Sequence, residues 1–377
     1  MSEAFEIIAA EIADKRAISF ARFMELALYC PDCGYYEAEK DTVGRRGDYY
    51  TSVSVGSLFG ELLGFQFAAW FEQISPSPAR SGPTSPARCQ ILEAGAHQGH
   101  LARDILCWLG NHRAALFRNL EYWIIEPSRR RRQWQQDTLA QFSNNVRWAA
   151  ASSDLPPPGA SDGPRIIFAN ELLDAMPVHR FAWDARTGSW FEWGIMLNGN
   201  QLAWTRLPLP DRTLPGAVGE LAADLSNVLP DGFVVECSPA AENWWRSAAT
   251  LLGRGKLLAL DYGLTTHELL APERKEGTLR AYRAHQFERD LLAVPGKQDI
   301  TAHVDFSVIR AAGEAAGLTT ECFATQENFL TGIAGRVWEN PAAFGHWTSG
   351  RTRQFQTLTH PNHLGRCFRV LVQHRPN

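Results

Sequence analysis

The chain has 377 residues, of which 45% are hydrophobic, 21% charged and 11% aromatic. This length and composition are typical of a globular protein with one large domain or two ordinary ones, and they exclude a disordered or fibrous chain. The formal net charge of -4 offers no basic field to nucleic acid or an anionic membrane, and no apolar stretch reaches the roughly 20 residues that span a bilayer. The acidic N-terminus also lacks an apolar signal region, so we expect a cytoplasmic location without nucleic-acid or membrane partners.

Residues 1–75 are predicted to form a helical cap or lid region. Apolar residues recur there at i, i+3 and i+4 over 57–72, which predicts a buried helix that Ser57 could cap. The preceding segment, GDYYT at 47–51, either folds over a ligand as part of a lid or packs its two tyrosines into the core. A Pro-rich connector at 75–86 separates this front region from a second domain over 87–377.

Two local motifs are interpreted as structure rather than chemistry. Cys30 and Cys33 form a CxxC pair, but a zinc or redox site needs further ligands or a strand-to-helix turn, so we favour two thiols in a turn and expect no metal. The run Arg129–Arg132 winds around more than one helical turn and cannot present one flat face to nucleic acid. A solvated helix start is the better interpretation.

From Cys89 onward, short apolar runs alternate with amphipathic segments through short loops. This alternation predicts βαβ units and therefore an α/β fold with a parallel, doubly wound sheet. The strands are expected near 91–94, 122–126, 146–148, 166–171, 233–236, 257–261, 318–324 and 367–372, and helices at 129–142, 240–252 and 304–316.

Residues 178–206 interrupt the α/β pattern. Alternating aromatic residues and the turn pair Asn198-Gly199 predict antiparallel β-hairpins, which we interpret as an insertion. Its tryptophans either pack in a core or form a surface for docking a partner, and they are Trp183, Trp190, Trp193 and Trp204.

The strongest chemical signal is Glu93-x-Gly95-x-x-x-Gly99, which lies between a predicted strand and helix. Glycines at such a turn allow close backbone approach to a ligand, and the free N–H groups of the helix start face it. Glu126 ends the next strand, where an acid in a Rossmann-like fold accepts hydrogen bonds from ribose hydroxyls. This combination indicates a nucleoside site, although a tight turn and a solvent-facing Glu would also explain it.

The identity of the nucleoside follows from the residues between the glycines. A dinucleotide fingerprint needs glycine at the third and sixth positions, where this chain has His97 and His100. NAD and FAD are therefore disfavoured, and no GxxxxGK[ST] motif is present for a triphosphate. S-adenosylmethionine fits better, because its carboxylate can meet helix N–H groups while its cationic groups favour acids such as Glu93.

Several further segments occur in a fixed order over roughly residues 15–335. They are ISFARFM at 18–24, GYY at 34–36, GDYYTS at 47–52, FGELL at 59–63, ANELLDAMPV at 169–178, DYG at 261–263, GTLRAYR at 277–283 and DITAHVDF at 299–306. Together they resemble the MidA/mitochondrial complex I assembly factor 7 family of class I methyltransferases. The resemblance implies a Rossmann-like seven-stranded sheet, a helical N-terminal cap, inserted segments and S-adenosylmethionine as cofactor.

The chain departs from the family pattern at two places. The glycine loop of the family resembles ExGPGxG, whereas this chain has Ala96 and His97 for the Pro and the second Gly. After Thr51-Ser52 the family often has Pro-Glu, whereas this chain has Val53 and Ser54. The candidates for cofactor binding are Glu93, Gly95, Ala96, Gly99, Glu126, Asn170, Gly47 and Thr51.

The acceptor site is predicted at the end of the strand that closes with Asn170. Glu171 and Asp174 are the candidate catalytic acids, since paired carboxylates could hold a permanently cationic guanidinium in bidentate geometry. The alternative is that Asn170 and Asp174 only cap a following helix. His303 is a third catalytic candidate, as a proton acceptor, although a lone His is more often a structural residue.

Other charged residues are expected at the same edge of the sheet. Asp261, Arg280, Arg283 and Asp305 follow predicted core strands. The two arginines either hold an acidic group of a partner or pair with Asp261 or Asp305.

The interpretation is an S-adenosylmethionine-dependent methyltransferase. The family resemblance implies a protein side chain, arginine foremost, as the acceptor, and therefore a protein partner. The alternative is a non-catalytic assembly or chaperone-like factor that retains the fold. A nucleotide-dependent oxidoreductase is the third possibility, which His97 and His100 disfavour.

Overall fold

The computed structural model describes residues 2–37, 51–74, 88–159, 163–209, 228–283 and 286–376. The predicted Pro-rich connector and Gly47–Tyr50 lie outside these residues. The chain divides into two compact units that interleave along the sequence. The first unit comprises Met1–Tyr49, Leu173–Trp244 and Gly263–Ile309, and the second comprises Tyr50–Leu172, Trp245–Tyr262 and Arg310–Asn377.

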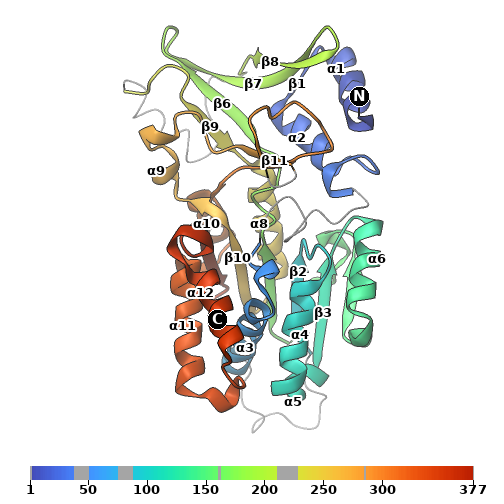
Figure 1. The fold of residues 1–377 in the computed structure, drawn as a ribbon, viewed down its shortest axis with the longest axis vertical. Helices are drawn as coiled ribbons and strands as arrows, with labels where there is room; N and C mark the ends of the chain where they lie inside the picture. The colour runs from blue at the N-terminus through green and yellow to red at the C-terminus, as the bar shows by residue number, and fades with distance from the viewer. Residues whose placement is uncertain are drawn as a thin grey trace. The chain divides into compact units, whose positions relative to one another are not determined.

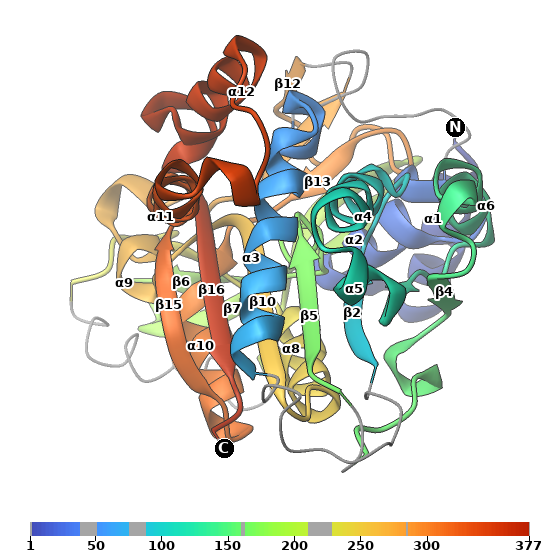
Figure 2. The same ribbon diagram turned by 90° about the horizontal axis from the view of Figure 1, so that it is seen from below.

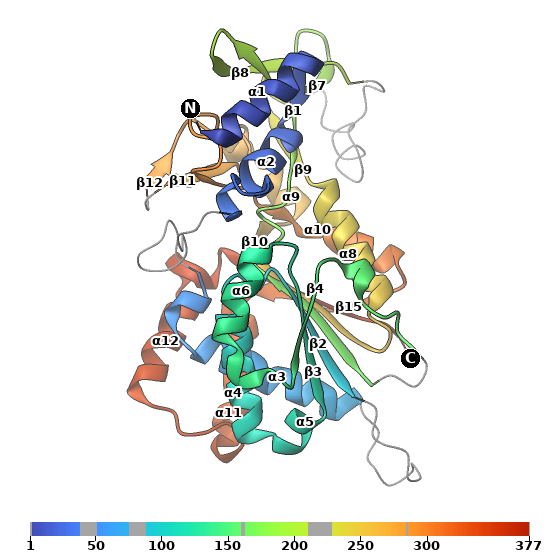
Figure 3. The ribbon, with the colours of Figure 1, turned by 90° about the vertical axis from the view of Figure 1, so that its right-hand side faces the viewer.

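The second unit is built on a mixed sheet with the strand order β15-β16-β10-β5-β2-β3-β4. All neighbours from β10 to β4 pair in parallel, and β16 pairs antiparallel with both β10 and β15. Figure 2 shows the order from β15 to β2, and Figure 3 shows the strands in side view. The strands are β2 (Cys89–Ala94), β3 (Leu120–Ile125), β4 (Val146–Ala149), β5 (Arg165–Asn170), β10 (Gly255–Leu264), β15 (Thr319–Thr325) and β16 (Phe368–His374).

Helices bury the two faces of this sheet. One face packs on a core that includes Phe59, Ile105 and Ile333. On the other face, Gln373 of β16 accepts a hydrogen bond from Trp245 Nε1 at 2.8 Å. The helices are α3 (Leu58–Ile74), α4 (His100–His112), α5 (Ala114–Arg118), α6 (Arg129–Thr138), α11 (Gln326–Glu339) and α12 (Ser349–Thr359), with α8 (Pro239–Leu251) and α10 (Phe306–Ala315) running from one unit into the other.

The first unit joins N-terminal helices to an antiparallel sheet of order β1-β7-β6-β9, with β8 on β7 (Figure 1). It also contains a small sheet of order β12-β11-β13. Residues as distant in sequence as Ile8, Phe20, Ile195 and Ile300 share its core. Its elements are α1 (Glu3–Lys15), β1 (Ala17–Ser19), α2 (Phe20–Tyr29), β6 (His179–Asp184), β7 (Ser189–Asn198), β8 (Gln201–Leu207), β9 (Val234–Cys237), α9 (Thr266–Leu269), β11 (Arg280–Arg283), β12 (Gln286–Glu288), β13 (Asp299–Thr301) and β14 (Val304–Asp305).

The predicted α/β fold, helical N-terminal cap and β-hairpin insertion are confirmed. The hairpin β6–β7 turns at Gly188 and the hairpin β7–β8 at Gly199, which have φ of 61° and 59°, in the left-handed region that favours glycine. Trp183 and Trp190 are buried in a second core of the first unit, which favours packing over docking for these two side chains. No helix in the described ranges is long and apolar enough to cross a membrane.

Several short helical turns lie outside these helices and strands. The 3₁₀ turns are η1 (Tyr35–Glu37), η2 (Val53–Val55), η4 (Ala140–Phe142), η5 (Ser152–Asp154), η6 (Pro272–Arg274) and η7 (Pro341–Ala343), and Pro361–Gly365 form a π turn.

Candidate cofactor and active site

The carboxyl ends of four parallel strands meet at one edge of the sheet in the second unit. In the register, Ala94 of β2 lies opposite Ile125 of β3 and Ala169 of β5, and Leu260 of β10 lies opposite Asn170. The chain proceeds from β2 through β3 to β4 on one side, and from β5 to β10 on the other. The strand order therefore reverses between β2 and β5, and open α/β sheets bind ligands at such a point.

The glycine loop after β2 needs both of its glycines. Gly95 has a φ of 73°, and a Cβ at this position would lie 2.9 Å from Cδ1 of Leu172. Gly99 has a φ of 80° and is the N-cap of α4, where it brings no side chain to the first N–H groups of the helix. Those N–H groups can therefore meet a carboxylate of a ligand.

His97 occupies a left-handed conformation in the same loop, with a φ of 47°. This backbone geometry explains why a glycine suits the position, since a side chain there is strained. Burial lowers the pKa of His97 to about 3, so the ring is neutral at pH 7, and the ring lies 6.3 Å from Trp134 in an edge contact. Ala96, the neighbouring departure from the family pattern, is buried.

Glu126 is part of a buried hydrogen-bond network, so the interpretation as a solvent-facing Glu is wrong. Its Oε1 accepts from the N–H of Ser128, and its Oε2 accepts from Nε2 of Gln135, both at 3.0 Å. The same Nε2 donates to the carbonyl oxygen of His97, and Gln135 Oε1 accepts from Trp148 Nε1. Gln135 thus ties the glycine loop to the carboxylate after β3.

Sequence reasoning missed Gln135, which is completely buried. It lies in a helix of otherwise polar residues, RRRRQWQQDT, where one more Gln has no distinguishing character. The signal that could have found it is its i, i+4 spacing to the buried Leu139, which places both on the inward face of the helix.

Glu93 lies buried near the end of β2. Its Oε2 accepts a hydrogen bond from the Tyr122 hydroxyl at 2.7 Å, and its side chain is buried. Burial raises the pKa of Glu93 to about 7, against the opposing effect of the Tyr122 bond. A cation brought near this carboxyl would favour its ionised form.

Asn170 and Glu171 meet the segment that begins at Thr51. Glu171 Oε1 accepts from the N–H of Ser52 at 3.2 Å and from Asn170 Nδ2 at 3.1 Å. Thr51 is buried, and its hydroxyl and carbonyl oxygens both bond to Ser54, one of the residues that depart from the family pattern. The structure therefore places Thr51, Asn170 and Glu171 in one cluster at the end of β5.

Backbone geometry after β5 is unusual. Glu171 has a φ of 51°, and the N–H of the next residue, Leu172, donates to Asp261 Oδ2 at 3.1 Å. Residues 171–178 contain no helix, so the alternative in which Asn170 and Asp174 cap a helix is wrong. Strained conformations of this kind are held in place by their surroundings and occur often at active sites.

The remaining catalytic candidates belong to the first unit. Asp174 is buried, and its carbonyl oxygen accepts from the N–H of Ala302. The N–H of His303 donates to Thr278 Oγ1 at 3.0 Å. Burial and, to a lesser degree, Arg280 and Arg274 lower the pKa of His303 to about 4, so its ring is neutral at pH 7.

The two predicted arginines do not pair with the acids proposed for them. Arg283 pairs with Glu288 at 3.6 Å, and Arg280 lies over the ring of Phe287. Asp305 accepts instead from Thr266 Oγ1 and from backbone N–H groups at the start of α10.

The residues at the edge of the second unit fit the group that the resemblance implies. Asn170 Oδ1 is buried and has no hydrogen-bond donor among the described residues, which suits an ammonium group. Gly95 and Gly99 let the loop pack closely against Leu172 and Leu139, where a Cβ would crowd those side chains, and the N–H groups of α4 suit a carboxylate. The donor set therefore matches a nucleoside with an amino-acid tail.

Comparisons with known proteins also indicate an S-adenosylmethionine-dependent methyltransferase. The sequence profile of a family described as S-adenosyl-L-methionine-dependent methyltransferase matches residues 62–324. A protein from Burkholderia thailandensis, crystallised with S-adenosyl-homocysteine, superposes with a TM-score of 0.82 at 30% identity, covering 99% of this chain and 92% of that one. A second, native structure from the same organism has a TM-score of 0.78 at 31% identity, with 99% and 91% covered.

Curated relatives cover most of the chain. The mitochondrial protein arginine methyltransferase NDUFAF7 homolog of Drosophila melanogaster is 28% identical over 356 residues, 87% of this chain and 74% of the relative. The mitochondrial protein arginine methyltransferase NDUFAF7 of Homo sapiens is 28% identical over 324 residues, 80% of this chain and 67% of the relative. The expected cytoplasmic location is contradicted by these relatives, which are mitochondrial. That expectation rested on the acidic N-terminus and its lack of an apolar signal region.

Proposed function

The chain belongs to the family of S-adenosyl-L-methionine-dependent methyltransferases, and on that premise we propose that it methylates an arginine side chain of a protein. S-adenosylmethionine is its cofactor. The observation that carries the proposal is the cluster of buried acids and glycines at the switch point of the sheet. The names of the curated relatives, protein arginine methyltransferases, support arginine as the acceptor.

The cofactor would be held by the loop and strand ends of the second unit. Gly95, Ala96 and Gly99 provide the close approach and the helix N–H groups for its carboxylate. Glu126, which Ser128 and Gln135 orient, is the candidate acceptor for the ribose hydroxyls. Asn170 Oδ1 would accept from the ammonium group, and Thr51, in the same cluster at the end of β5, is a further candidate contact.

When bound, S-adenosylmethionine supplies a methyl group on a sulfonium sulfur, which leaves as a neutral thioether. The protein has to align an acceptor nitrogen behind that methyl group and exclude water. A guanidinium nitrogen is a poor nucleophile because its lone pair is delocalised. Carboxylates that bond one side of the guanidinium localise its charge and free the lone pair of the opposite nitrogen.

Glu171 and Asp174 are our candidates for these carboxylates. Ser52 and Asn170 already orient the Glu171 carboxylate by bonding to one of its oxygens. His303 is less suited to remove the final proton, because its lowered pKa makes it a weak base. Its neutral ring suits a hydrogen bond from a cationic group instead.

The test is radiolabelled methyl transfer to proteins of a lysate from cells that lack the gene, followed by mass spectrometry of arginine residues. We expect monomethyl- or dimethylarginine with the wild-type protein. The double variant Glu171→Ala/Asp174→Ala should lose transfer while S-adenosylhomocysteine still raises its melting temperature. Methyl transfer to lysine alone, or unchanged transfer by the double variant, would contradict the proposal. Binding without any transfer would favour an assembly factor.

A further inference from the structure

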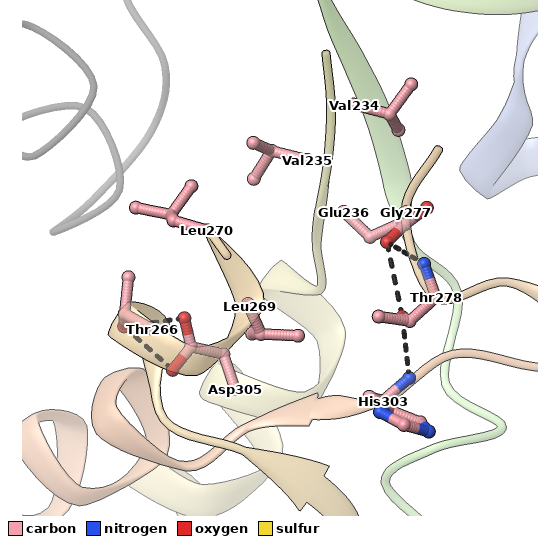
Figure 4. A pocket seen from close by; sticks show the side chains of 10 residues that line it. All are labelled: Val234, Val235, Glu236, Thr266, Leu269, Leu270, Gly277, Thr278, His303 and Asp305. Carbon is pink, nitrogen blue, oxygen red and sulfur yellow. Dashed lines mark hydrogen bonds between the residues drawn. The ribbon is translucent and has the colours of Figure 1, made fainter. Parts of the chain in front are cut away.

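A group of polar side chains in the first unit lines two hollows. Glu236, His303 and Asp305 belong to the walls of both. The smaller hollow is shown in Figure 4, with Glu236 and His303 reaching it from different segments. The larger has a volume of about 60 Å³. Since about 10–15 Å³ is enough to hold one water, the larger hollow has room for more than a single water.

Glu236 is a buried carboxylate with one oxygen satisfied and one not. Its side chain, on β9, is 5% exposed. Oε2 accepts from the N–H of Thr278 at 2.8 Å and from its hydroxyl at 3.2 Å. Oε1 has no hydrogen-bond donor within the described ranges. This oxygen lies over Gly277, where a Cβ would come within 1.9 Å of it, so the glycine leaves the space that the carboxylate occupies.

His303 presents a second acceptor to the same hollows. Its Nδ1 is buried and, among the residues that the structure describes, has no hydrogen-bond partner. The ring is neutral at pH 7, because burial lowers its pKa to about 4. A neutral imidazole can accept a hydrogen bond from a cation without repelling it. Burial also raises the pKa of Glu236, against the opposing effects of Arg180 and of the Thr278 hydrogen bonds.

The other charged groups around the hollows are already engaged. Asp305 accepts from Thr266, Ser307 and Val308 and thereby starts α10. Arg180 approaches Glu236, but its Nε lies 3.8 Å from Oε1, too far for a hydrogen bond. The guanidinium of Arg180 stacks over Trp204 and donates to the carbonyl oxygen of Glu276.

We propose that this cavity is a recognition subsite for an arginine side chain of the protein substrate, with the guanidinium between Glu236 Oε1 and His303 Nδ1. Two acceptors without donors call for a ligand with several N–H groups. A cationic ligand would add to the charge of Arg180, which lies 3.8 Å from Glu236 Oε1 without bonding to it. The larger hollow has room for a small polar group such as a guanidinium. Leu173, Val178 and Ile309 line that hollow and suit the methylene stem of the side chain.

That the arginine belongs to a protein substrate rests on the proposed function. The ability of the cavity to bind a guanidinium does not depend on that function. The test is therefore a binding measurement on the full chain without cofactor. N-acetyl-arginine methylamide, its lysine counterpart and its neutral citrulline counterpart are titrated by calorimetry or by chemical-shift changes. We expect the arginine compound to bind most tightly and the citrulline compound not to bind.

Variants distinguish binding in the cavity from a general effect of the protein's charge on a cationic ligand. Glu236→Gln should weaken binding of the arginine compound about tenfold or more, because a charge-assisted hydrogen bond is lost in a buried site. Glu288→Gln removes the same charge from an exposed strand of the first unit and should leave the affinity unchanged. His303→Leu removes the second acceptor without a charge change and should also weaken binding, which keeps the test decisive if Glu236→Gln folds poorly.

In turnover assays, Glu236→Gln should raise KM for a protein substrate more than it lowers kcat. Equal affinity of wild type and both cavity variants would overturn the inference and leave Glu236 as a partner of Arg180 alone. Equal binding of the lysine compound would overturn the assignment to a guanidinium. If arginine methylation fails but this binding persists, only the proposed function is lost. If methylation persists without binding, only the subsite is lost.

Discussion

Replacing Gln135 by methionine is the perturbation that tests the cofactor site most informatively. Methionine has a similar volume but cannot donate to Glu126 Oε2 and the His97 carbonyl oxygen or accept from Trp148 Nε1, each bond now 3.0 Å long. A bond to an ionised carboxylate contributes about 1.5–3 kcal/mol and a neutral one about 1 kcal/mol. The sum of one such charged bond and two neutral ones predicts a loss of about 3.5–5 kcal/mol in the free energy of unfolding.

The functional consequence is expected in ligand affinity. Without Gln135 the Glu126 carboxylate and the glycine loop lose their common anchor, so the affinity for S-adenosylhomocysteine should fall about tenfold or more, or at least about 1.4 kcal/mol. The assays are urea unfolding and calorimetric titration. Gln136→Met changes an exposed neighbour on the same helix and is the matched control. Gln135→Glu retains an acceptor for Trp148 but lacks the donors, and it should also lose affinity.

Two results would refute this reasoning. If Gln135→Met unfolds at the same urea concentration as Gln136→Met, the buried network contributes nothing to stability. If stability falls but the affinity for S-adenosylhomocysteine stays at the wild-type value, Gln135 is a structural residue and does not orient the ribose acid.

Two further predictions concern the same edge of the sheet. Gly95→Ala and Gly188→Ala impose similar strain, about 1 kcal/mol, because both glycines have positive φ; a new Cβ meets Leu172 at position 95 and open space at 188. Calorimetry should therefore show lost S-adenosylhomocysteine binding for Gly95→Ala alone, and equal binding by both variants would contradict this role of the glycine loop. The pKa of Glu93 is raised from 4.5 to about 7, so this group stabilises the fold fully below pH 4.5 and loses about 3 kcal/mol of that contribution as pH rises to about 7. Unfolding of Glu93→Gln should lack this decline relative to wild type between pH 4.5 and 8, and parallel curves would count against the buried acid.

The local parts of the fold and site were predictable from the sequence. The strand, glycine loop, helix and second strand around Glu93, Gly99 and Glu126 lie within a short stretch, where hydrophobic periodicity and turn residues carry the information. The sequence also predicted the hairpins around Asn198-Gly199, because that turn chemistry is local. These predictions depend on neighbours in the chain, which a single sequence displays.

The remaining features depend on contacts between distant segments. Ser52 bonds to Glu171 across 119 positions, and Leu172 bonds to Asp261 across 89. No local sequence pattern predicts such pairs. The left-handed conformations of His97 and Glu171 are also not predictable locally, because tertiary packing imposes them. The interleaving of the two units along the chain also depends on contacts between distant segments. Within the first unit, for example, α1 and β13 share one core through residues such as Ile8 and Ile300.

Calorimetric titration of S-adenosylhomocysteine into wild type and Glu126→Ala tests the central claim most directly. The claim is that the cofactor lies at the carboxyl edge of β2, β3 and β5, with its ribose bonded to Glu126. We predict one site per chain in the wild type and an affinity at least about a hundredfold lower in the variant, since two charge-assisted bonds are lost. Equal affinity of the two proteins, or no binding to the wild type, would contradict the account.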